Sequence, residues 1–310
     1  MIPDRDYFYL TLRMALLGES NTPFLRTASS DTWQRLFDLA RKQAVSGLFF
    51  DALQGIPGGL DIPHTDLLAL VRDADHIRER SVRIRHLAGT ILEQASAAGF
   101  SPIVMKGPAV AAFYPSPDLR TPGDLDLYIP PDQWNAALTW FEGKEGELTA
   151  SPDGSLHLRK GGVDIDLHPR YYDLYVSEKA LPKVPSPEGT LVMLSAHILK
   201  HAAGPGVGIR QVCDMAMACR ALQGQYDPEK LCRYYRDTGT MAWNRLLDSY
   251  IKERLGIETG LPLKTVPTAS FERILFAGGD FGHYGPSRQK ALRRPAWRRK
   301  VDTAGRLLRH

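Results

Sequence analysis

Two stretches of the chain decide its fold class: residues 104–129 read VMKGPAVAAFYPSPDLRTPGDLDLYI, and residues 163–170 read VDIDLHPR. Successive side chains of a β-strand point to opposite faces, so the alternation over 124–129 and over 163–168 predicts two strands, each with an apolar and an acidic face. If the two strands are neighbours in one sheet, four carboxylates share one patch, namely Asp124, Asp126, Asp164 and Asp166.

Carboxylates that lie this close raise one another's pKa values unless a cation neutralises them. Oxygen ligands of this kind suit Mg²⁺ or Mn²⁺, and two ions roughly 3.5–4 Å apart would form a clamp for phosphoryl chemistry. A solvated amphipathic strand also alternates apolar with acidic residues, so one DxD pair alone would indicate little. The second acidic strand favours a site, and so does the Lys106-Gly107 turn between a short apolar run and a helix that starts at Pro108.

This order of elements resembles the DNA polymerase β nucleotidyltransferase superfamily, with its glycine-rich turn, DxD strand and third carboxylate on a later strand. More narrowly, the two stretches are similar to an uncharacterised bacterial nucleotidyltransferase group marked by KG, R-x3-DxD and a DxH strand. The likeness covers roughly residues 30–225 and includes the segments ARKQAVSGLFFDAL, HILKH and IRQVCDMA. The resemblance implies an α+β fold, in which a polymerase-β-like core of a small mixed sheet and helices is flanked by N- and C-terminal helical segments.

The resemblance also implies residue roles. Asp124 and Asp126 match the metal-binding pair, and Asp166 matches the third carboxylate, which helps to deprotonate an attacking hydroxyl. Asp164 stays an alternative because it lies on the same strand face. Gly107 matches the phosphate-binding turn, but the serine that commonly follows it in the superfamily is replaced here by a proline, which offers neither a hydroxyl nor an N–H.

The reaction implied is transfer of an NMP from a nucleoside triphosphate (NTP) to an acceptor hydroxyl or phosphate, with Mg²⁺ or Mn²⁺ as cofactor and release of pyrophosphate. The sequence leaves the acceptor open between a small molecule, a protein and an RNA. The alternative function is a non-catalytic module that binds nucleotide or acts as a scaffold in a biosynthetic or toxin–antitoxin system.

Other polar residues are candidates for the cleft. Lys106 and Arg120 could bind triphosphate oxygens or could form ion pairs with the acidic cluster. His197 and His201 have the spacing of a zinc pair, but the glutamate of a HExxH motif is missing, so we do not expect zinc. The resemblance favours a place for both histidines in the nucleotide or acceptor cleft, with Lys200 beside them as a nucleotide-binding residue. The remaining candidates are Tyr128 (a stacking surface or a partly buried strand residue), His168 (orienting Asp166 or a metal-bound water), and Arg210 with Asp214 (cleft residues or a helix-surface pair).

Apolar spacing predicts helices on both sides of the core. One helix is expected from a cap at Asp31 to Gly55, and a longer one from about Thr65 to Ala98. Further helices are expected over 130–140, 188–203 and 209–223. The predicted organisation is a helical region over 1–99, the α/β core over 100–181, a helical domain over 182–284 and a basic tail over 285–310.

The composition is that of a globular protein: 43% of the 310 residues are hydrophobic and 24% are charged, which excludes disorder, collagen and a coiled coil. Three cysteines without a CxxC pair support neither a disulfide framework nor a zinc ribbon, and they favour a cytoplasmic location. We expect neither a signal peptide nor a transmembrane segment. Residues 285–310 hold nine Lys or Arg against one acid, so this tail either contacts nucleic acid, an anionic membrane or an acidic partner, or is a solvated helical end.

Overall fold

The computed structural model describes residues 4–145, 148–151, 153–204 and 206–279, so the basic tail 285–310 lies outside the described residues. The helices before the sheet are α1 (Asp4–Leu17), α2 (Thr22–Leu25), α3 (Ser30–Lys42), α4 (Ser46–Gln54) and α5 (His64–Ala97). Between and after the strands lie α6 (Pro108–Ala111), α7 (Trp134–Glu145), α8 (Pro187–Ala202), α9 (Ile209–Ala221), α10 (Pro228–Asp237), α11 (Met241–Tyr250) and α12 (Ala269–Gly278). The short turns are η1 (Pro117–Leu119), η2 (Pro131–Gln133), η3 (Glu178–Ala180) and the π-helical turn η4 (Ile251–Leu255). None of the described helices has the length and apolar character that crossing a bilayer requires.

The sheet has five strands in the order β1-β2-β5-β4-β3, with β1 (Ile103–Val104), β2 (Leu125–Tyr128), β3 (Thr149–Ala150), β4 (Leu156–Lys160) and β5 (Val163–His168). The two acidic strands, β2 and β5, are neighbours and run parallel, and the other pairs are antiparallel. Asp126 lies opposite Asp166 in this register. The condition for a shared acidic patch, neighbouring strands with matching faces, is therefore met.

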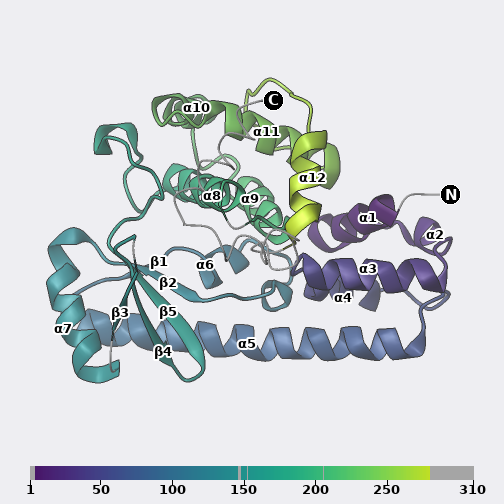
Figure 1. The fold of residues 1–310 in the computed structure, drawn as a ribbon, viewed down its shortest axis with the longest axis horizontal. Helices are drawn as coiled ribbons and strands as arrows, with labels where there is room; N and C mark the ends of the chain where they lie inside the picture. Colours follow the sequence, from purple (N-terminus) through teal and green to yellow (C-terminus); the bar gives the residue numbers. More distant parts are fainter. Residues whose placement is uncertain (1–3, 146–147, 152, 205, 280–310) are drawn as a thin grey trace, which may run out of the picture.

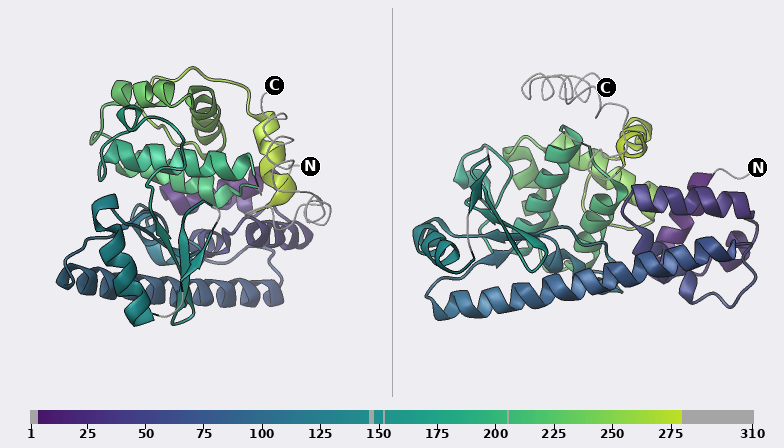
Figure 2. Two further views of the ribbon diagram at one scale, coloured as in Figure 1. Left: turned by 60° about the vertical axis from the view of Figure 1, so that its left-hand side comes forward. Right: turned by 60° about the horizontal axis from the view of Figure 1, so that its bottom comes forward.

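One face of the sheet is closed by an apolar cluster. Leu125, Leu127, Ile165 and Leu167 point to this face and are fully buried against α5 and α7. Figure 1 shows α5 running beneath the sheet and α8 and α9 lying on the opposite side, and Figure 2 shows the same layering from two further directions. Because the apolar side chains take one face, the acidic side chains of β2 and β5 project toward α8.

The helices before and after the sheet share a second hydrophobic cluster. Side chains of α1, α3 and α4, such as Phe8, Phe37 and Phe49, pack in it together with side chains of α8, α9, η4 and α12, such as Leu275. Helices from the ranges 1–99 and 182–279 thus contribute side chains to this second cluster, which is distinct from the cluster beneath the sheet.

The prediction of one helix from Asp31 to Gly55 is wrong, because this segment forms two helices, α3 and α4. The chain breaks between α3 and α4, where Ala44 has a φ of +54°. Buried Gln43 stabilises the break, since its amide donates to the carbonyl of Leu275 at 3.0 Å and accepts from the N–H of Ile209 at 2.8 Å. Both partners are distant in the sequence, so periodicity gives no sign of them. The N-cap is Ser29, whose Oγ accepts from the N–H of Thr32, and not Asp31.

The remaining helices follow the sequence pattern closely. The long helix expected from about Thr65 to Ala98 is α5, and Gly99 follows it with a φ of +87°. The segment from Pro130 to Trp140 starts as the turn η2 and continues as α7 to Glu145. Strands β3 and β4 were not predicted from the sequence.

Candidate active site

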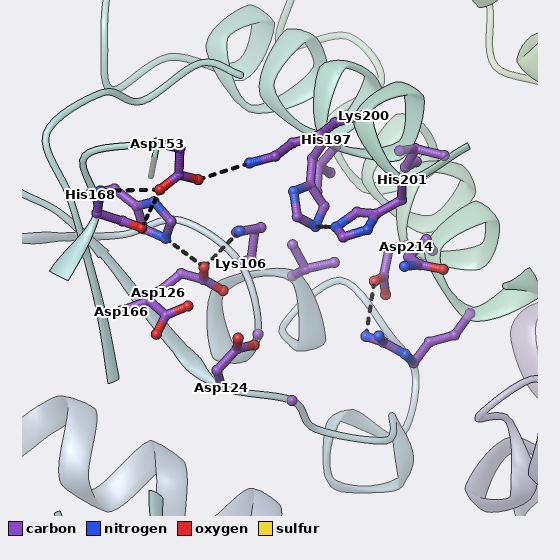
Figure 3. A pocket seen from close by; sticks show the side chains of 18 of the residues that line it. Lys106, Asp124, Asp126, Asp153, Asp166, His168, His197, Lys200, His201 and Asp214 are labelled. Atoms are coloured by element: carbon purple, nitrogen blue, oxygen red, sulfur yellow. Dashed lines mark hydrogen bonds and ion pairs between the residues drawn. The ribbon is translucent and has the colours of Figure 1, made fainter. Parts of the chain in front are cut away.

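A cavity of about 430 Å³ lies between the acidic face of the sheet and helices α8 and α9. Most of the candidate residues identified from the sequence line this cavity: Lys106, Gly107, Arg120, Asp124, Asp126, Asp166, His168, His197, Lys200, His201, Arg210 and Asp214. Figure 3 shows side chains that line the cavity, with those of the sheet and its adjoining loops on one side and those of α8 and α9 on the other. The cavity volume falls within the roughly 300–1,000 Å³ typical of small-molecule sites.

Asp126, Asp166 and His168 form a group that could hold a metal ion. Each offers one ligand atom, and these atoms all lie within 4.8 Å of one another. Asp124, one residue before β2, is exposed as a residue, but its carboxylate lies among the walls of the same cavity (Figure 3). The pKa of Asp124 is raised because the site desolvates its carboxylate and because Asp126 repels its charge.

Asp126 is buried and already has two polar partners. Lys106 Nζ donates to its Oδ1 at 2.6 Å, and His168 Nε2 donates to the same oxygen at 2.8 Å. Burial alone would raise the pKa of Asp126, but the charges and hydrogen bonds of Lys106 and His168 outweigh it, so that the pKa lies well below the ordinary value. The pKa of Lys106 is raised in turn, because attraction to Asp126 outweighs its burial. The carboxylate is therefore ionised and balanced by a lysine.

Asp166 has a partner that the sequence analysis missed. His157 on β4 lies opposite it in the antiparallel register and donates from Nδ1 to its Oδ1. The other ring nitrogen of His157 is hydrogen-bonded to Ser151. Residues 156–160 read LHLRK and are joined to β5 by Gly161 and Gly162, both with positive φ. A two-glycine link between two alternating segments is a strong hairpin signal, and it could have placed His157 beside Asp166.

Asp164 and Tyr128 lie outside the cavity wall as the structure describes it. The Asp164 side chain is 55% exposed and lies 3.7 Å from Nε of Arg159 on β4. Of the two alternatives for the third carboxylate, Asp166 is the one beside Asp126. Tyr128 is half-buried and packs edge-on against Tyr171, with ring centroids 5.4 Å apart, as a partly buried strand tyrosine would.

Helix α8 forms the opposite wall with His197, Lys200 and His201. Lys200 Nζ donates to Asp173 at 2.8 Å and to Asp153 at 3.3 Å, two carboxylates that the sequence analysis did not identify. Asp173 also accepts from Nδ1 of His197 at 3.3 Å. Asp153 and Asp173 lie in loops that show no hydrophobic periodicity, so no sequence pattern indicated them as site residues. Asp153 and Asp173 thus hold the Lys200 ammonium at the α8 side of the cavity, and Figure 3 shows the contact with Asp153.

The two histidines of α8 contact each other, with their Nε2 atoms 3.1 Å apart. One of these nitrogens must donate a proton and the other must accept it, so at least one ring is neutral. Burial and the nearby charges of His197, Lys106 and Lys200 lower the pKa of His201 to about 2. The pKa of His197 is also lowered, by burial and by Lys106.

The Arg210 and Asp214 pair is buried, so its interpretation as a helix-surface pair is wrong. Asp214 accepts two hydrogen bonds from Arg120, each of 2.7 Å, and a third from the hydroxyl of Tyr114, also at 2.7 Å. Arg210 Nη1 is 3.9 Å from the same carboxylate. The fork between Arg120 and Asp214 ties the loop that precedes Asp124 to helix α9.

Gly107 brings the turn before α6 against the start of β2. Its φ of +57° and ψ of −112° belong to a region that residues with a side chain avoid, and a Cβ here would lie 3.1 Å from the carbonyl oxygen of Asp124. The following helix α6 spans only four residues and starts at Pro108. The glycine therefore permits a close backbone approach next to the carboxylates.

The donor set fits a hard divalent cation. Carboxylate oxygens are the ligands that Mg²⁺ and Mn²⁺ prefer, and His168, held against Asp126, can either supply a nitrogen ligand or orient that carboxylate. Repulsion from Asp126, which raises the pKa of Asp124, is also what a bound cation would relieve.

Residues 29–255, well over half of the chain, match the model of a protein family described as an uncharacterised nucleotidyltransferase. The comparison with curated proteins and the comparison with solved structures give no match.

Proposed function

The chain belongs to this nucleotidyltransferase family, and on that premise we propose that it is a metal-dependent enzyme that transfers an NMP from an NTP to an acceptor and releases pyrophosphate. The observation that carries the proposal is the pairing of β2 with β5, which sets Asp126 opposite Asp166 in a cavity that Asp124 also lines.

Asp124, Asp126 and Asp166 would hold two Mg²⁺ or Mn²⁺ ions. When bound, such ions neutralise charge on the phosphates and on the departing pyrophosphate. Asp166 is suited to accept the proton of the acceptor hydroxyl, since it is partly exposed to the cavity and is oriented by His157. Asp124 and Asp126 are suited to hold the cations because both carboxylates line the cavity and Asp124 lies beside the Gly107 turn.

The phosphates would lie against the cationic side chains of the cavity. Lys106 stands beside Asp126, and Lys200 is fixed at the opposite wall by Asp153 and Asp173. A triphosphate between them would gain attraction from both walls. Arg120 donates two hydrogen bonds to the buried carboxylate of Asp214. It is therefore better suited to position the loop before Asp124 than to bind phosphate.

One observation favours the alternative of a non-catalytic nucleotide-binding or scaffold module. The Lys106 ammonium lies 2.6 Å from Asp126 and balances its charge within the protein. A cation that used this oxygen would have to displace the lysine toward the phosphates. Nucleotide binding without transfer is therefore the second candidate function.

Transfer is tested by incubating the protein with each α-labelled NTP, Mg²⁺ or Mn²⁺ and a cell extract, and by following label into a new product. We expect product with the native chain and none with Asp124→Ala or Asp126→Ala. Asp164→Ala is the matched control, because this aspartate lies on the same face of β5 but outside the cavity, and it should retain activity. Equal label with and without Asp124 and Asp126 would contradict catalysis, and binding of NTP without product would support the alternative.

A further inference from the structure

A second, smaller pocket opens beside Asp124, on the side away from β5. It has a volume of about 200 Å³ and lies between α5, α6 and the loop from η1 to β2. It shares Gly107, Arg120 and Asp124 with the main cavity, so the two spaces adjoin. Its volume is below the roughly 300–1,000 Å³ of a pocket that encloses a whole small ligand, so it suits one ring system that belongs to a larger molecule.

The walls of this pocket are mainly apolar and rigid. They consist of proline rings and short aliphatic side chains, namely Ile84, Pro108, Ala111, Ala112, Pro117 and Pro122. The two arginines that border it, Arg85 and Arg120, are paired with Asp118 and Asp214. A phosphate has little to attract it here, whereas a flat and uncharged group can stack between apolar side chains.

Ser81 of α5 supplies the polar contact. The residue is only 8% exposed, its Oγ is buried, and it lines this pocket. Within the described part of the chain, its hydroxyl has no hydrogen-bond partner. A buried hydroxyl without a partner is unfavourable, and a ligand atom that donates or accepts a hydrogen bond would satisfy it.

The position of the pocket indicates that it receives part of the nucleotide and not part of the acceptor. The acceptor hydroxyl has to reach Asp166, which lines the main cavity but not the small pocket. Asp124 and Gly107 line both spaces, so a molecule whose phosphates lie in the main cavity can extend past these residues into the pocket. An anionic chain joined to a flat, hydrogen-bonding ring has the charge distribution of an NTP.

We propose that the pocket formed by α5, α6 and the loop before β2 is the subsite for the nucleobase of the NTP, with Ser81 hydrogen-bonded to the edge of the base. This inference rests on the proposed function, because the main cavity must receive the phosphates.

The test measures calorimetric affinities for the four NTPs and for inorganic tripolyphosphate, all with Mg²⁺. Ala112→Phe fills the pocket from an exposed position with ordinary helical dihedrals, and Ser81→Ala removes the hydroxyl without adding volume. Ala97→Phe is the matched control, because this exposed alanine lies on α5, the helix of Ser81, but about 18 Å beyond Arg85.

We expect Ala112→Phe to weaken binding of the best-bound NTP by about tenfold or more, as loss of one stacked base does. We expect Ser81→Ala to weaken it by about two- to tenfold, as loss of one hydrogen bond does. Tripolyphosphate affinity should stay as in the native chain for both variants, and the control should leave all affinities unchanged.

The assignment is overturned if the native chain binds NTPs and neither variant weakens them, or if NTP and tripolyphosphate affinities fall by the same factor. It is also overturned if Ala112→Phe leaves NTP affinity intact but abolishes transfer, since the pocket would then hold the acceptor. If the native chain binds neither NTP nor tripolyphosphate, the proposed function fails together with the inference.

Discussion

Gly107 adopts a backbone conformation that only glycine occupies at low cost, and a Cβ there would press on the carbonyl oxygen of Asp124. We expect Gly107→Ala to lower the free energy of unfolding by about 1–3 kcal/mol and to weaken NTP binding, because the turn must move away from the carboxylates. Urea denaturation and calorimetry measure the two effects. Gly123→Ala is the control, since a Cβ at Gly123 meets nothing within 4 Å. Equal effects of the two substitutions would contradict the argument.

The buried histidine pair of α8 makes stability depend on pH. His201 has a pKa near 2 in the folded chain, because burial and the charges of His197, Lys106 and Lys200 oppose its protonation, although Asp173 favours it. An unfolded chain binds the proton at about pH 6.5, so this histidine lowers stability as the pH falls below that value and has no such effect above it.

The substitution His201→Gln isolates the contribution of His201 to the pH dependence of stability. Between about pH 7 and pH 5, the free energy of unfolding of the native chain should fall more steeply than that of His201→Gln, because glutamine takes up no proton. Urea denaturation at several pH values gives both curves, and the histidines that do not contact His201 contribute equally to each; His197, which contacts it, is included in the measured difference. Parallel curves would show that His201 is readily protonated in the folded chain.

At the level of residues, the sequence predicted the acidic centre because strand alternation fixes which side chains share a face. Asp124, Asp126 and Asp166 could be placed together from this rule alone, once the two strands were taken as neighbours. Asp153 and Asp173 could not be predicted, since they reach Lys200 from loops whose course depends on tertiary packing.

Among the elements, α4 and η1 meet at a point where no side chain fits. A Cβ on Gly47 would lie 2.1 Å from the carbonyl oxygen of Leu119, the residue before Arg120. We expect Gly47→Ala to destabilise the protein by about 1–3 kcal/mol, as overpacking of a close contact does, and to weaken NTP binding through displacement of the Arg120 loop. Thermal or urea unfolding measures the first effect.

Gly89→Ala is a control that should change the free energy of unfolding in the opposite direction. Gly89 lies exposed within α5, and a Cβ there meets nothing within 4 Å. Gly89→Ala should therefore stabilise the protein by about 0.5–1 kcal/mol, because alanine loses less backbone entropy in a helix. If Gly47→Ala were neutral or stabilising like Gly89→Ala, the close contact between α4 and η1 would be refuted.

The elements that the sequence predicted well have strong local patterns. Helix α5 carries its apolar period over 34 residues, and β5 coincides with the alternating segment 163–168. The break between α3 and α4 was missed because it depends on Gln43 bonding to α9 and α12. Strand β4 was missed although its alternation and the following glycine pair are visible in the sequence.

Across the whole molecule, the first and last described helices are joined by a buried polar network. Glu272 of α12 accepts from the hydroxyl of Tyr9 at 3.0 Å and from Arg5 at 3.0 Å, both on α1. Arg254 of η4 donates to the same carboxylate at 3.2 Å. Since α1 and α12 lie outside the matched range 29–255, this network attaches two elements at the ends of the described chain to the core that the family model covers.

Removing this carboxylate should release both ends at once. Glu272→Ala removes the shared acceptor of Arg254 and Tyr9, and since Arg5 is 47% exposed and can turn to solvent, we expect a loss of about 1–3 kcal/mol in the free energy of unfolding. Hydrogen exchange of the full chain should show faster exchange in α1 as well as in α12. Exposed Glu258 provides the control, and Glu258→Ala should leave exchange in both helices unchanged. Faster exchange in α12 alone would mean that α1 is held by its apolar packing against α4 and not by the carboxylate.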